Sequence, residues 1–558
     1  MVEVLESGGQ EVVVPDSGRS ESPASTVAAA YSMPKLIEQQ ILQNQEQSVS
    51  SSADQAVQEL TQLQQFYAGQ KIFITGGTGF LGKLLIEKLL RSCPGVGFIY
   101  LLVRPKKGKD VHQRTEELFD DPLFARLKEE QPKFRHQIVA ISGDCSLPSL
   151  GISAVDRAVL LREVSIVFHV AATVRFDEKL KLAVAINVQS PRDILNLCKE
   201  MPQLKACVHV STAYANCIRK QIEEKFYDAP IDGQKLISLL ECMDDKMVDD
   251  ITRPILGKWP NTYTFTKAVA EDIIRQEADG TPIGIFRPAI VISTYQEPIR
   301  GWIDNMYGPT GVVAGAGTGL LRSLHCDGTL KANVVPGDMT VNALIASAWD
   351  VAQTKQNNKH SNDIPVYNYV STDDNPLTWD QLKVMSAKYG LDIPTSRAVW
   401  YYSFRNTKSK IVHLFYIYFL HLLPALLVDA VTLCVGKQPR MLKVYKKIHK
   451  FMDVLNYFTT QEWSFSNDRV NSLIDKLEPK DRSMFNMDMR KVIWDTYFQN
   501  YVRGIRLYLI KDPIETLPQA RIKWQRMYWI HQTLKALLGY ALLRFSWFAV
   551  SWVVRVLA

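Results

Sequence analysis

The sequence lacks three features that would each define a class of protein. Its eight cysteines form no C-x-x-C pair, which argues against zinc ribbons and disulfide scaffolds and fits a reduced compartment. The N-terminus has no secretory series of basic, apolar and small residues, since Val12–Val14 is too short an apolar run. No G-x-S-x-G elbow is present, which weighs against a serine hydrolase. We therefore expect a cytosol-facing protein, and we predict no metal site.

Composition and charge narrow the remaining classes. Apolar residues make up 46% and charged residues 22% of the 558-residue chain, which excludes wholesale disorder, collagen-like repeats and a polytopic transporter. Residues 401–558 carry 24 bases against 11 acids, whereas residues 1–60 carry nine acids and two bases. The basic C-terminal third predicts an anionic partner, either a membrane surface, a nucleic acid or a phosphorylated substrate. Nucleic acid is the weakest of these, because no nucleic-acid module is visible.

Alternating apolar runs and helical patterns predict the fold class. Residues 1–65 are rich in Ser, Gln and Glu and poor in aromatics, so we expect a disordered leader there. Six apolar runs then alternate with helical patterns: Lys71–Thr75, Phe98–Val103, Ile138–Ser142, Ile166–Val170, Cys207–Val210 and Ile283–Phe286. Such runs are typical of a parallel sheet covered on both faces. We predict a doubly wound α/β domain of the Rossmann type over residues 66–375.

A mostly helical region, predicted over residues 376–510, and a membrane-anchoring tail over 511–558 follow. Two stretches are candidate spans, Ile411–Val435 and Ala536–Ala558. The first contains His421, Pro424 and Asp429, so a buried or interfacial helix fits it at least as well as a span. The second contains Arg544, which would cost roughly 2.5–3.5 kcal/mol near a bilayer centre. We predict attachment to a membrane and leave the topology open.

A glycine-rich loop between the first strand and the next helix predicts a dinucleotide site. Gly76 permits the tight turn, Gly79 lets the pyrophosphate approach the backbone, and Gly82 allows the helix to pack closely on the strand. The helix N-terminus supplies oriented N–H groups to the phosphates. The predicted contacts of this loop are Thr75, Gly76, Gly77, Thr78, Gly79, Phe80, Leu81 and Gly82.

The end of the second strand favours NADPH over NADH. An NAD site would place an acid there, whereas this chain has Arg104 and no acid before Asp110. A guanidinium can hold a 2′-phosphate in a bidentate manner, although a solvated basic loop would also carry such residues. Asp144 is placed either to accept a hydrogen bond from the adenine amine or to cap its loop. Ala171 and Arg287 complete the predicted cofactor contacts.

A tyrosine and a lysine four residues apart form the predicted catalytic pair. Tyr263 and Lys267 lie on one face of a predicted helix. A phenol with a pKa near ~10 is a poor acid or base at neutral pH, and we expect the adjacent ammonium to lower that pKa. Ser211 and Thr212 end a predicted strand, so either hydroxyl could donate a hydrogen bond to the substrate oxygen, although a simple turn is the alternative.

Together, the glycine loop, Val210–Asn216 and Tyr263–Lys267 resemble the extended short-chain dehydrogenases/reductases. The further block Glu297–Arg322 and the helical C-terminal region narrow the resemblance to the alcohol-forming fatty acyl-CoA reductases. Thr318 stands where that family usually has a lysine, so any phosphate role of that lysine is lost or moved.

The resemblance implies NADPH-dependent reduction of a long-chain fatty acyl-CoA, through an aldehyde, to a primary alcohol. It implies that Tyr263 protonates the oxyanion and that Lys267 holds the nicotinamide ribose. It also implies a membrane-associated enzyme of the peroxisome or the endoplasmic reticulum whose catalytic domain faces the cytosol. The alternatives are a membrane-associated steroid or sugar-nucleotide dehydrogenase of the same superfamily, and a catalytically silent lipid-binding scaffold. The sequence does not indicate an oligomeric state.

Overall fold

A seven-stranded parallel sheet forms the centre of the computed structural model, which describes residues 60–106, 108–357, 363–371, 373 and 375–557. The strand order is β11-β7-β5-β4-β1-β2-β3. The strands are β1 (Lys71–Thr75), β2 (Phe98–Val103), β3 (Ile138–Ser142), β4 (Ile166–His169), β5 (Ala206–Val210), β7 (Ile283–Pro288) and β11 (Val366–Tyr369). All neighbours in this sheet pair in parallel, which confirms the predicted doubly wound fold.

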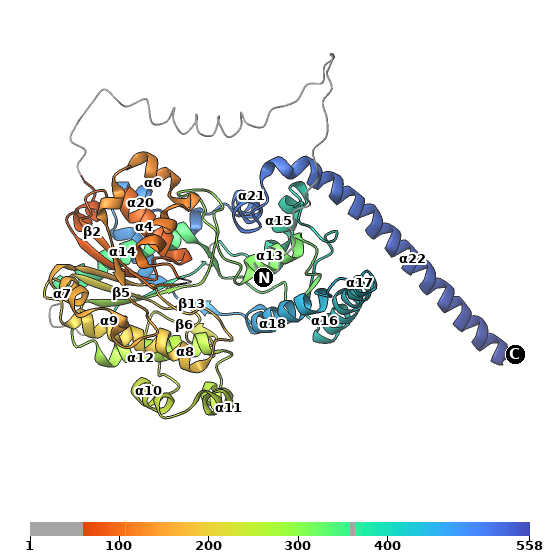
Figure 1. Cartoon of the computed structure of the whole chain (residues 1–558), viewed down its shortest axis with the longest axis horizontal. Helices are drawn as coiled ribbons and strands as arrows, with labels where there is room; N and C mark the ends of the chain where they lie inside the picture. The colour runs from red at the N-terminus through yellow and green to blue at the C-terminus, as the bar shows by residue number, and fades with distance from the viewer. Residues whose placement is uncertain (1–59, 107, 358–362, 372, 374, 558) are drawn as a thin grey trace, which may run out of the picture.

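Helices cover both faces of the sheet, as its continuously apolar strands require. Helices α4 (Phe80–Ser92) and α14 (Gly337–Asn357) lie on one face, and α7 (Ala154–Glu163), α9 (Ser190–Lys199) and α12 (Thr262–Glu277) lie on the other (Figure 1). Further helices of this half are α5 (Val111–Phe119), α6 (Ala125–Glu130), α8 (Leu180–Val184), α10 (Gly233–Glu241), α11 (Asp245–Leu256) and α13 (Pro309–Gly317).

The packed part of the described chain includes residues before the predicted boundary at residue 66. Helix α3 (Gln62–Tyr67) starts at a capping box formed by Thr61 and Gln64, and its Leu63 and Tyr67 are fully buried. The backbone N–H of Leu63 donates to Asp481, 3.1 Å away, which ties this helix to the C-terminal half. Residues 60–65 therefore belong to the packed structure, and the remainder of the predicted leader lies outside the described residues.

The C-terminal half packs onto the first half. Strand β12 (Arg405–Thr407) pairs with β9 (Ser323–His325), and β13 (Ser464–Phe465) pairs with β6 (Gln221–Ile222). A further short pair joins β8 (Ile290–Ile292) to β10 (Val334–Pro336). The helices are α15 (Trp379–Asp392), α16 (Lys410–Tyr416), α17 (Leu423–Cys434), α18 (Met441–Thr459), α19 (Asp468–Lys476), α20 (Pro479–Met484), α21 (Trp494–Gly504) and α22 (Leu517–Leu557).

Two helical segments of the described chain are long and apolar enough to cross a membrane. The first, Lys410–Cys434, runs through α16, the π-helical turn η5 (Ile417–Leu422) and α17. The second, Ile514–Leu557, is essentially α22, which extends away from the body as one rod (Figure 1). The predicted span Ala536–Ala558 thus corresponds, up to Leu557, to the outer half of a much longer helix.

Candidate active site

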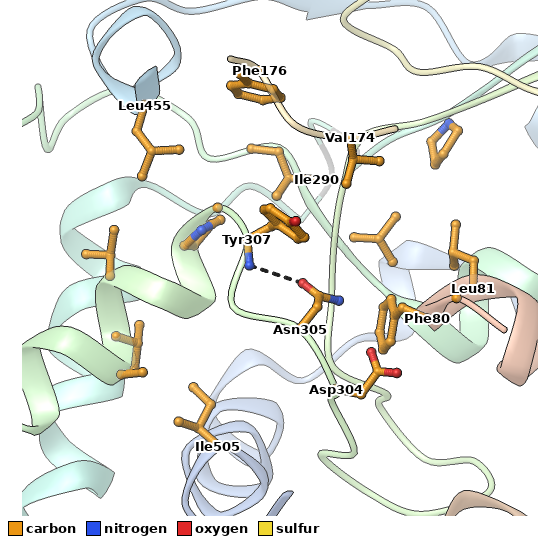
Figure 2. A pocket seen from close by; sticks show the side chains of 18 of the residues that line it. Phe80, Leu81, Val174, Phe176, Ile290, Asp304, Asn305, Tyr307, Leu455 and Ile505 are labelled. Atoms are coloured by element: carbon orange, nitrogen blue, oxygen red, sulfur yellow. Dashed lines mark hydrogen bonds between the residues drawn. The ribbon is translucent and has the colours of Figure 1, made fainter. Parts of the chain in front are cut away.

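A cavity of about 1010 Å³ lies at the carboxyl ends of the parallel strands and continues into the C-terminal half. Its lining includes glycines of the β1–α4 loop, Arg104 and, from the C-terminal half, Trp524 of α22. Figure 2 shows Phe176, Ile290, Leu455 and Ile505 pointing into this space from elements far apart in the sequence. Ligands of doubly wound sheets bind at this edge, so the cavity has the position of an active site.

The β1–α4 loop forms a cradle that side chains would fill. A Cβ atom on Gly76 would lie 2.6 Å from the backbone nitrogen of Ala171, and one on Gly82 would lie 2.2 Å from the carbonyl oxygen of Gly76. Gly79 forms the N-cap of α4 and has no side chain with which to cap it. The first N–H groups of α4 thus remain available to a phosphate, so the loop fits a dinucleotide.

Most of the predicted loop contacts face the cavity, but two do not. Gly76, Thr78, Gly79, Phe80, Leu81, Gly82 and Ala171 line it. Thr75 and Gly77 are not among the lining residues of the described chain. The Thr75 hydroxyl lies 2.7 Å from Nδ1 of His169 and accepts a hydrogen bond from the backbone N–H of Ala171. It therefore stabilises the loop through contacts with the end of strand β4. Gly77 faces Ile86 and Leu101 in the core beneath the loop.

Three basic side chains gather at the end of strand β2. Arg104 lines the cavity together with Lys106 and Arg114, and Arg114 donates a hydrogen bond to the carbonyl oxygen of Arg104. Asp144 lies 3.5 Å from the Arg104 guanidinium and accepts hydrogen bonds from the backbone and hydroxyl of Ser146, so it caps its loop while lining the cavity. The sequence analysis predicted a cofactor contact for Arg104 alone. Arg114 lies on α5, outside the segment that follows strand β2, so no sequence motif pointed to it.

Tyr263 and Lys267 lie side by side in the first turns of α12. The helix begins at Asn261, whose side chain accepts from the backbone N–H of Thr264 at 2.9 Å. Both side chains line the cavity, as predicted from their spacing. The Tyr263 ring stacks on Phe176 with the ring centroids 5.7 Å apart. The Lys267 ammonium donates to the carbonyl oxygen of Val210 at 2.7 Å.

Burial dominates the protonation of this pair. It raises the pKa of Tyr263 to about 12, against the opposing effect of a hydrogen bond with Thr212. It lowers the pKa of Lys267 to about 8, although the carboxylate of Glu271 acts in the opposite direction. The expected lowering of the tyrosine pKa by the lysine is therefore wrong, because desolvation raises this pKa and the Lys267 ammonium donates to the Val210 carbonyl rather than to the phenol.

A buried carboxylate distinguishes the two hydroxyls after strand β5. The Ser211 hydroxyl donates to Oε1 of Glu271 at 2.5 Å. The hydroxyl of Thr212 instead interacts with Tyr263 and accepts from the backbone N–H of Tyr214. Both residues contribute to the cavity lining, but only Thr212 directs its hydroxyl to the phenol.

Arg287 is a correction to the predicted cofactor contacts. Its guanidinium is fully buried, pairs with Glu271 at 2.7 Å and donates to the backbone carbonyls of Glu223 and Lys225. It is not among the described residues that line the cavity. A strand residue alternates between the two faces of its sheet, and the neighbouring Pro288 is the one that lines the cavity.

Apolar side chains from α13 and from the C-terminal half line the rest of the cavity. They come mainly from α13, α15, the 402–406 loop and the segment 502–510, and include Val312, Leu382, Leu391, Tyr402, Phe404, Val502, Ile505 and Ile510. The sequence analysis predicted a mostly helical region over residues 376–510 and did not identify these lining residues. Thr318, at the family's lysine position, caps α13 through a hydrogen bond to Ala314 and is buried.

Comparisons with known proteins agree with this geometry. An NAD-binding family model described as male sterility protein matches residues 74–344, and a second model with the same description matches residues 420–512. The reductase domain of a non-ribosomal peptide synthetase from Mycobacterium tuberculosis superposes with a TM-score of 0.51 at 18% identity, covering 79% of this chain and 92% of that one. This likeness shows the fold alone.

Curated relatives share far more of the sequence. Fatty acyl-CoA reductase wat of Drosophila melanogaster is 47% identical over 494 residues, which cover 88% of this chain and 94% of the relative. Human fatty acyl-CoA reductase 1 is 39% identical over 462 residues, which cover 83% and 89%. With these identities over nearly the full length of the relatives, the chain belongs to the fatty acyl-CoA reductase family.

Proposed function

We propose that this protein reduces long-chain fatty acyl-CoA to the primary alcohol through an aldehyde, with release of CoA. The observation that carries the proposal is the shared cavity, in which Tyr263, Lys267 and Thr212 meet a dinucleotide cradle at one end and an apolar lining at the other. A chain of ~16 carbons prefers an apolar phase by on the order of 12 kcal/mol, so it needs such a lining. A steroid or sugar-nucleotide dehydrogenase and a silent scaffold have no support among the relatives.

The side chains divide the work as follows. A nicotinamide cofactor, when bound, supplies the hydride for each reduction. Tyr263 donates a hydrogen bond to the thioester carbonyl and then a proton to the oxyanion, with Thr212 as second donor. Lys267 would hold the nicotinamide ribose. None of these groups forms a covalent bond to the substrate, and the thiolate of CoA is the leaving group.

We infer NADPH as the cofactor from the charges at its adenosine end. Arg104, Lys106 and Arg114 place cations where a 2′-phosphate would lie, and Asp144, the nearby acid on the cavity, already caps its own loop. Arg104→Ala should weaken NADPH binding by about 10–100-fold, since a charged hydrogen bond contributes about 1.5–3 kcal/mol. NADH binding should change by less than about threefold. Titration of NADPH and NADH, with a substitution of the exposed Lys133 (Lys133→Ala) as control, tests this. Equal losses of affinity for the two cofactors would exclude the 2′-phosphate role of Arg104.

We also propose that α22 attaches the enzyme to a membrane, with the catalytic domain facing the cytosol. The support is its length and its exposed apolar outer half. The peroxisome and the endoplasmic reticulum are the proposed organelles, because a fatty alcohol made at either surface would enter lipid metabolism.

Product analysis tests the proposed activity. Membranes containing the protein are incubated with palmitoyl-CoA and NADPH, and both hexadecanol and cofactor oxidation are measured. We expect two NADPH consumed for each alcohol formed. Oxidation of a steroid alcohol instead would support the dehydrogenase alternative, and NADPH binding without turnover would support the scaffold.

A further inference from the structure

The apolar segment 410–434 has one face fastened to the protein body along its length. Four of its residues are buried: His413, His421, Ala425 and Asp429. The last three are spaced four residues apart, so they lie on one side of the helix. The opposite side is exposed and apolar. The segment therefore has one face that packs on the protein and one that is free, whereas a transmembrane helix surrounded by lipid would be apolar on all sides.

Two histidines hold this face against the body. Nδ1 of His413 lies 2.8 Å from the hydroxyl of Ser323, on the short strand β9. Nε2 of His421 accepts a hydrogen bond from the backbone N–H of Arg322 at 3.0 Å, and its Nδ1 lies 3.2 Å from Nε2 of His449, on α18. These contacts join the segment to the strand pair that borders the cavity.

Asp429 fastens α17 to the start of α18. Its carboxylate accepts the backbone N–H groups of Arg440, Met441 and Leu442 at 3.0, 2.9 and 2.9 Å. These are N–H groups at the start of a helix, which need an acceptor. The two helices therefore form one unit, and whatever surrounds α17 also reaches α18.

Helix α18 cannot enter the hydrocarbon core of a membrane. Its exposed face carries Lys443, Lys446, Lys447 and Lys450, one helical turn apart. The first three make no ion pair with any other residue in the described part of the chain, and Lys450 pairs with Asp177. Its other end supplies Leu455, Phe458 and Thr459 to the cavity. A bilayer crossed by α17 would immerse these ammonium groups, for which hydrocarbon is a poor environment.

The outer face of the segment is nevertheless apolar and exposed, so its burial against an apolar partner would be favourable. Ile411, Phe415, Phe419, Leu427 and Val431 are 80%, 56%, 52%, 60% and 65% exposed. A patch of this kind with lysines beside it fits the boundary between acyl chains and anionic headgroups. The segment also lies on the same side of the molecule as the outer half of α22 (Figure 1).

We propose that segment 410–434 is not a transmembrane span but a docking surface that lies in one leaflet of an anionic membrane. In this arrangement α22 is the sole span of the described chain, and the lysines of α18 contact the headgroups. The proposal rests on the membrane attachment through α22 proposed above.

Cysteine labelling in sealed microsomes tests the topology of the full chain. The loop residue Gln438 follows the segment, and the exposed Cys242 on the catalytic half serves as internal reference. A chain carrying Cys434→Ser and Gln438→Cys is treated with a membrane-impermeant maleimide, and labelled peptides are quantified before and after detergent. Equal labelling of positions 242 and 438 before detergent is expected. Labelling at one of them only after detergent would make the segment a span and overturn the proposal.

Depth measurements test the leaflet contact itself. An environment-sensitive dye is attached at Phe419→Cys or Lys447→Cys in full chains that also carry Cys242→Ser and Cys434→Ser, reconstituted in phosphatidylcholine–phosphatidylserine vesicles. Nitroxides on the acyl chains should quench the dye at position 419, and aqueous iodide should quench the dye at position 447. Strong quenching of both by iodide would refute the docking surface. A chain that does not float with the vesicles would refute the attachment through α22 as well.

Discussion

At the scale of single residues, the adjacent hydroxyls of Ser211 and Thr212 differ in their hydrogen-bond partners. Ser211 is held by Glu271, which Arg287 also engages, whereas Thr212 is directed to Tyr263. Ser211→Ala should therefore lower the melting temperature and leave most of the activity, because it removes a partner from a buried ionic network. In the proposed mechanism, the reacting group is the phenol of Tyr263 and the Thr212 hydroxyl assists it.

Substitution of the phenol should abolish the chemistry and preserve cofactor binding. Tyr263→Phe is expected to lower alcohol formation by at least ~100-fold, the usual contribution of a positioned proton donor. Thr212→Ala should produce a smaller loss that Thr212→Ser restores. Steady-state rates with palmitoyl-CoA, together with NADPH titration, measure both effects. Undiminished turnover of Tyr263→Phe would remove the phenol from the mechanism.

The pH dependence should report the buried lysine. Burial lowers the pKa of Lys267 to about 8, so the cation proposed to hold the ribose is present below this pH and is lost as the pH rises above it. We expect kcat/KM for NADPH to decline above about pH 8, since this parameter reports groups of the free enzyme. Lys267→Arg keeps its charge and should remove the decline, at a lower maximum. A wild-type profile that stays flat to pH 9.5 would contradict this role.

Motifs revealed which residues take part but not how they are partnered. The glycine loop and the Tyr263–Lys267 spacing specify backbone paths, so most of these residues were found at the cavity. Arg287 was misassigned because a charged residue at a strand end reads as a ligand contact from sequence. Its partner Glu271 follows Lys267 by one helical turn, and this acid was the one available hint that a buried base lay opposite.

At the scale of elements, the approach of α4 to strand β1 depends on a missing side chain. A Cβ at Gly82 would lie 2.2 Å from the Gly76 carbonyl oxygen, a backbone atom that cannot rotate away. Gly82→Ala should therefore displace the N-terminus of α4, lower the melting temperature by several degrees and weaken NADPH binding by more than about tenfold. Thermal denaturation and cofactor titration measure these changes.

Gly95→Ala is the matched control for this prediction. A Cβ there would meet Ala68 at 3.4 Å, which is ordinary contact, and this loop is not part of the cavity lining. Its NADPH affinity should equal that of the wild type. Normal cofactor binding by Gly82→Ala would show that the loop tolerates the side chain and that the packing argument is wrong.

Six of the seven central strands could be predicted because each is a continuous, mostly apolar run, including the partly buried edge strand β3. Strand β11 (Val366–Tyr369) was missed because it has only four residues and the polar Asn368 interrupts its apolar pattern. The Asn368 amide donates to the carbonyls of Ile222 and Ser466. The pairing of β12 with β9 and of β13 with β6 was equally hidden, because two- and three-residue strands leave no periodicity to detect.

At the scale of the whole molecule, α22 is both part of the body and a tail. Trp524 lines the cavity, the ring of Tyr401 packs on Trp524 and Tyr528, and the indole of Trp400 donates to His531 at 3.1 Å. The boundary predicted at residue 511, which precedes α22, therefore assigns the packed first turns of this helix to the tail. The free portion begins after His531.

Two truncations should separate anchoring from folding. Deletion of residues 534–558 removes only the free portion, so the enzyme should keep its activity in detergent and become extractable from membranes by salt or alkali. Deletion of residues 511–558 also removes Asp512, which accepts hydrogen bonds from Thr395 and Ser396, and should lower the melting temperature and the activity. Flotation, thermal denaturation and alcohol formation measure these effects. Detergent-only extraction of the shorter deletion would show that α22 is not the anchor.

In the proposed function, one cavity serves both the nucleotide and the lipid. Arg104, about half exposed, lines it beside the dinucleotide loop, and Trp524 lines it from α22, the helix that leaves the body. Conversion of a thioester to an alcohol takes two hydrides, so a spent dinucleotide must be exchanged midway. If the acyl chain is held by the apolar lining supplied by the C-terminal half, this exchange does not require the half-reduced chain to leave. The reactive aldehyde would then stay in the cavity between the two hydride transfers, and the finished alcohol would enter the bilayer directly.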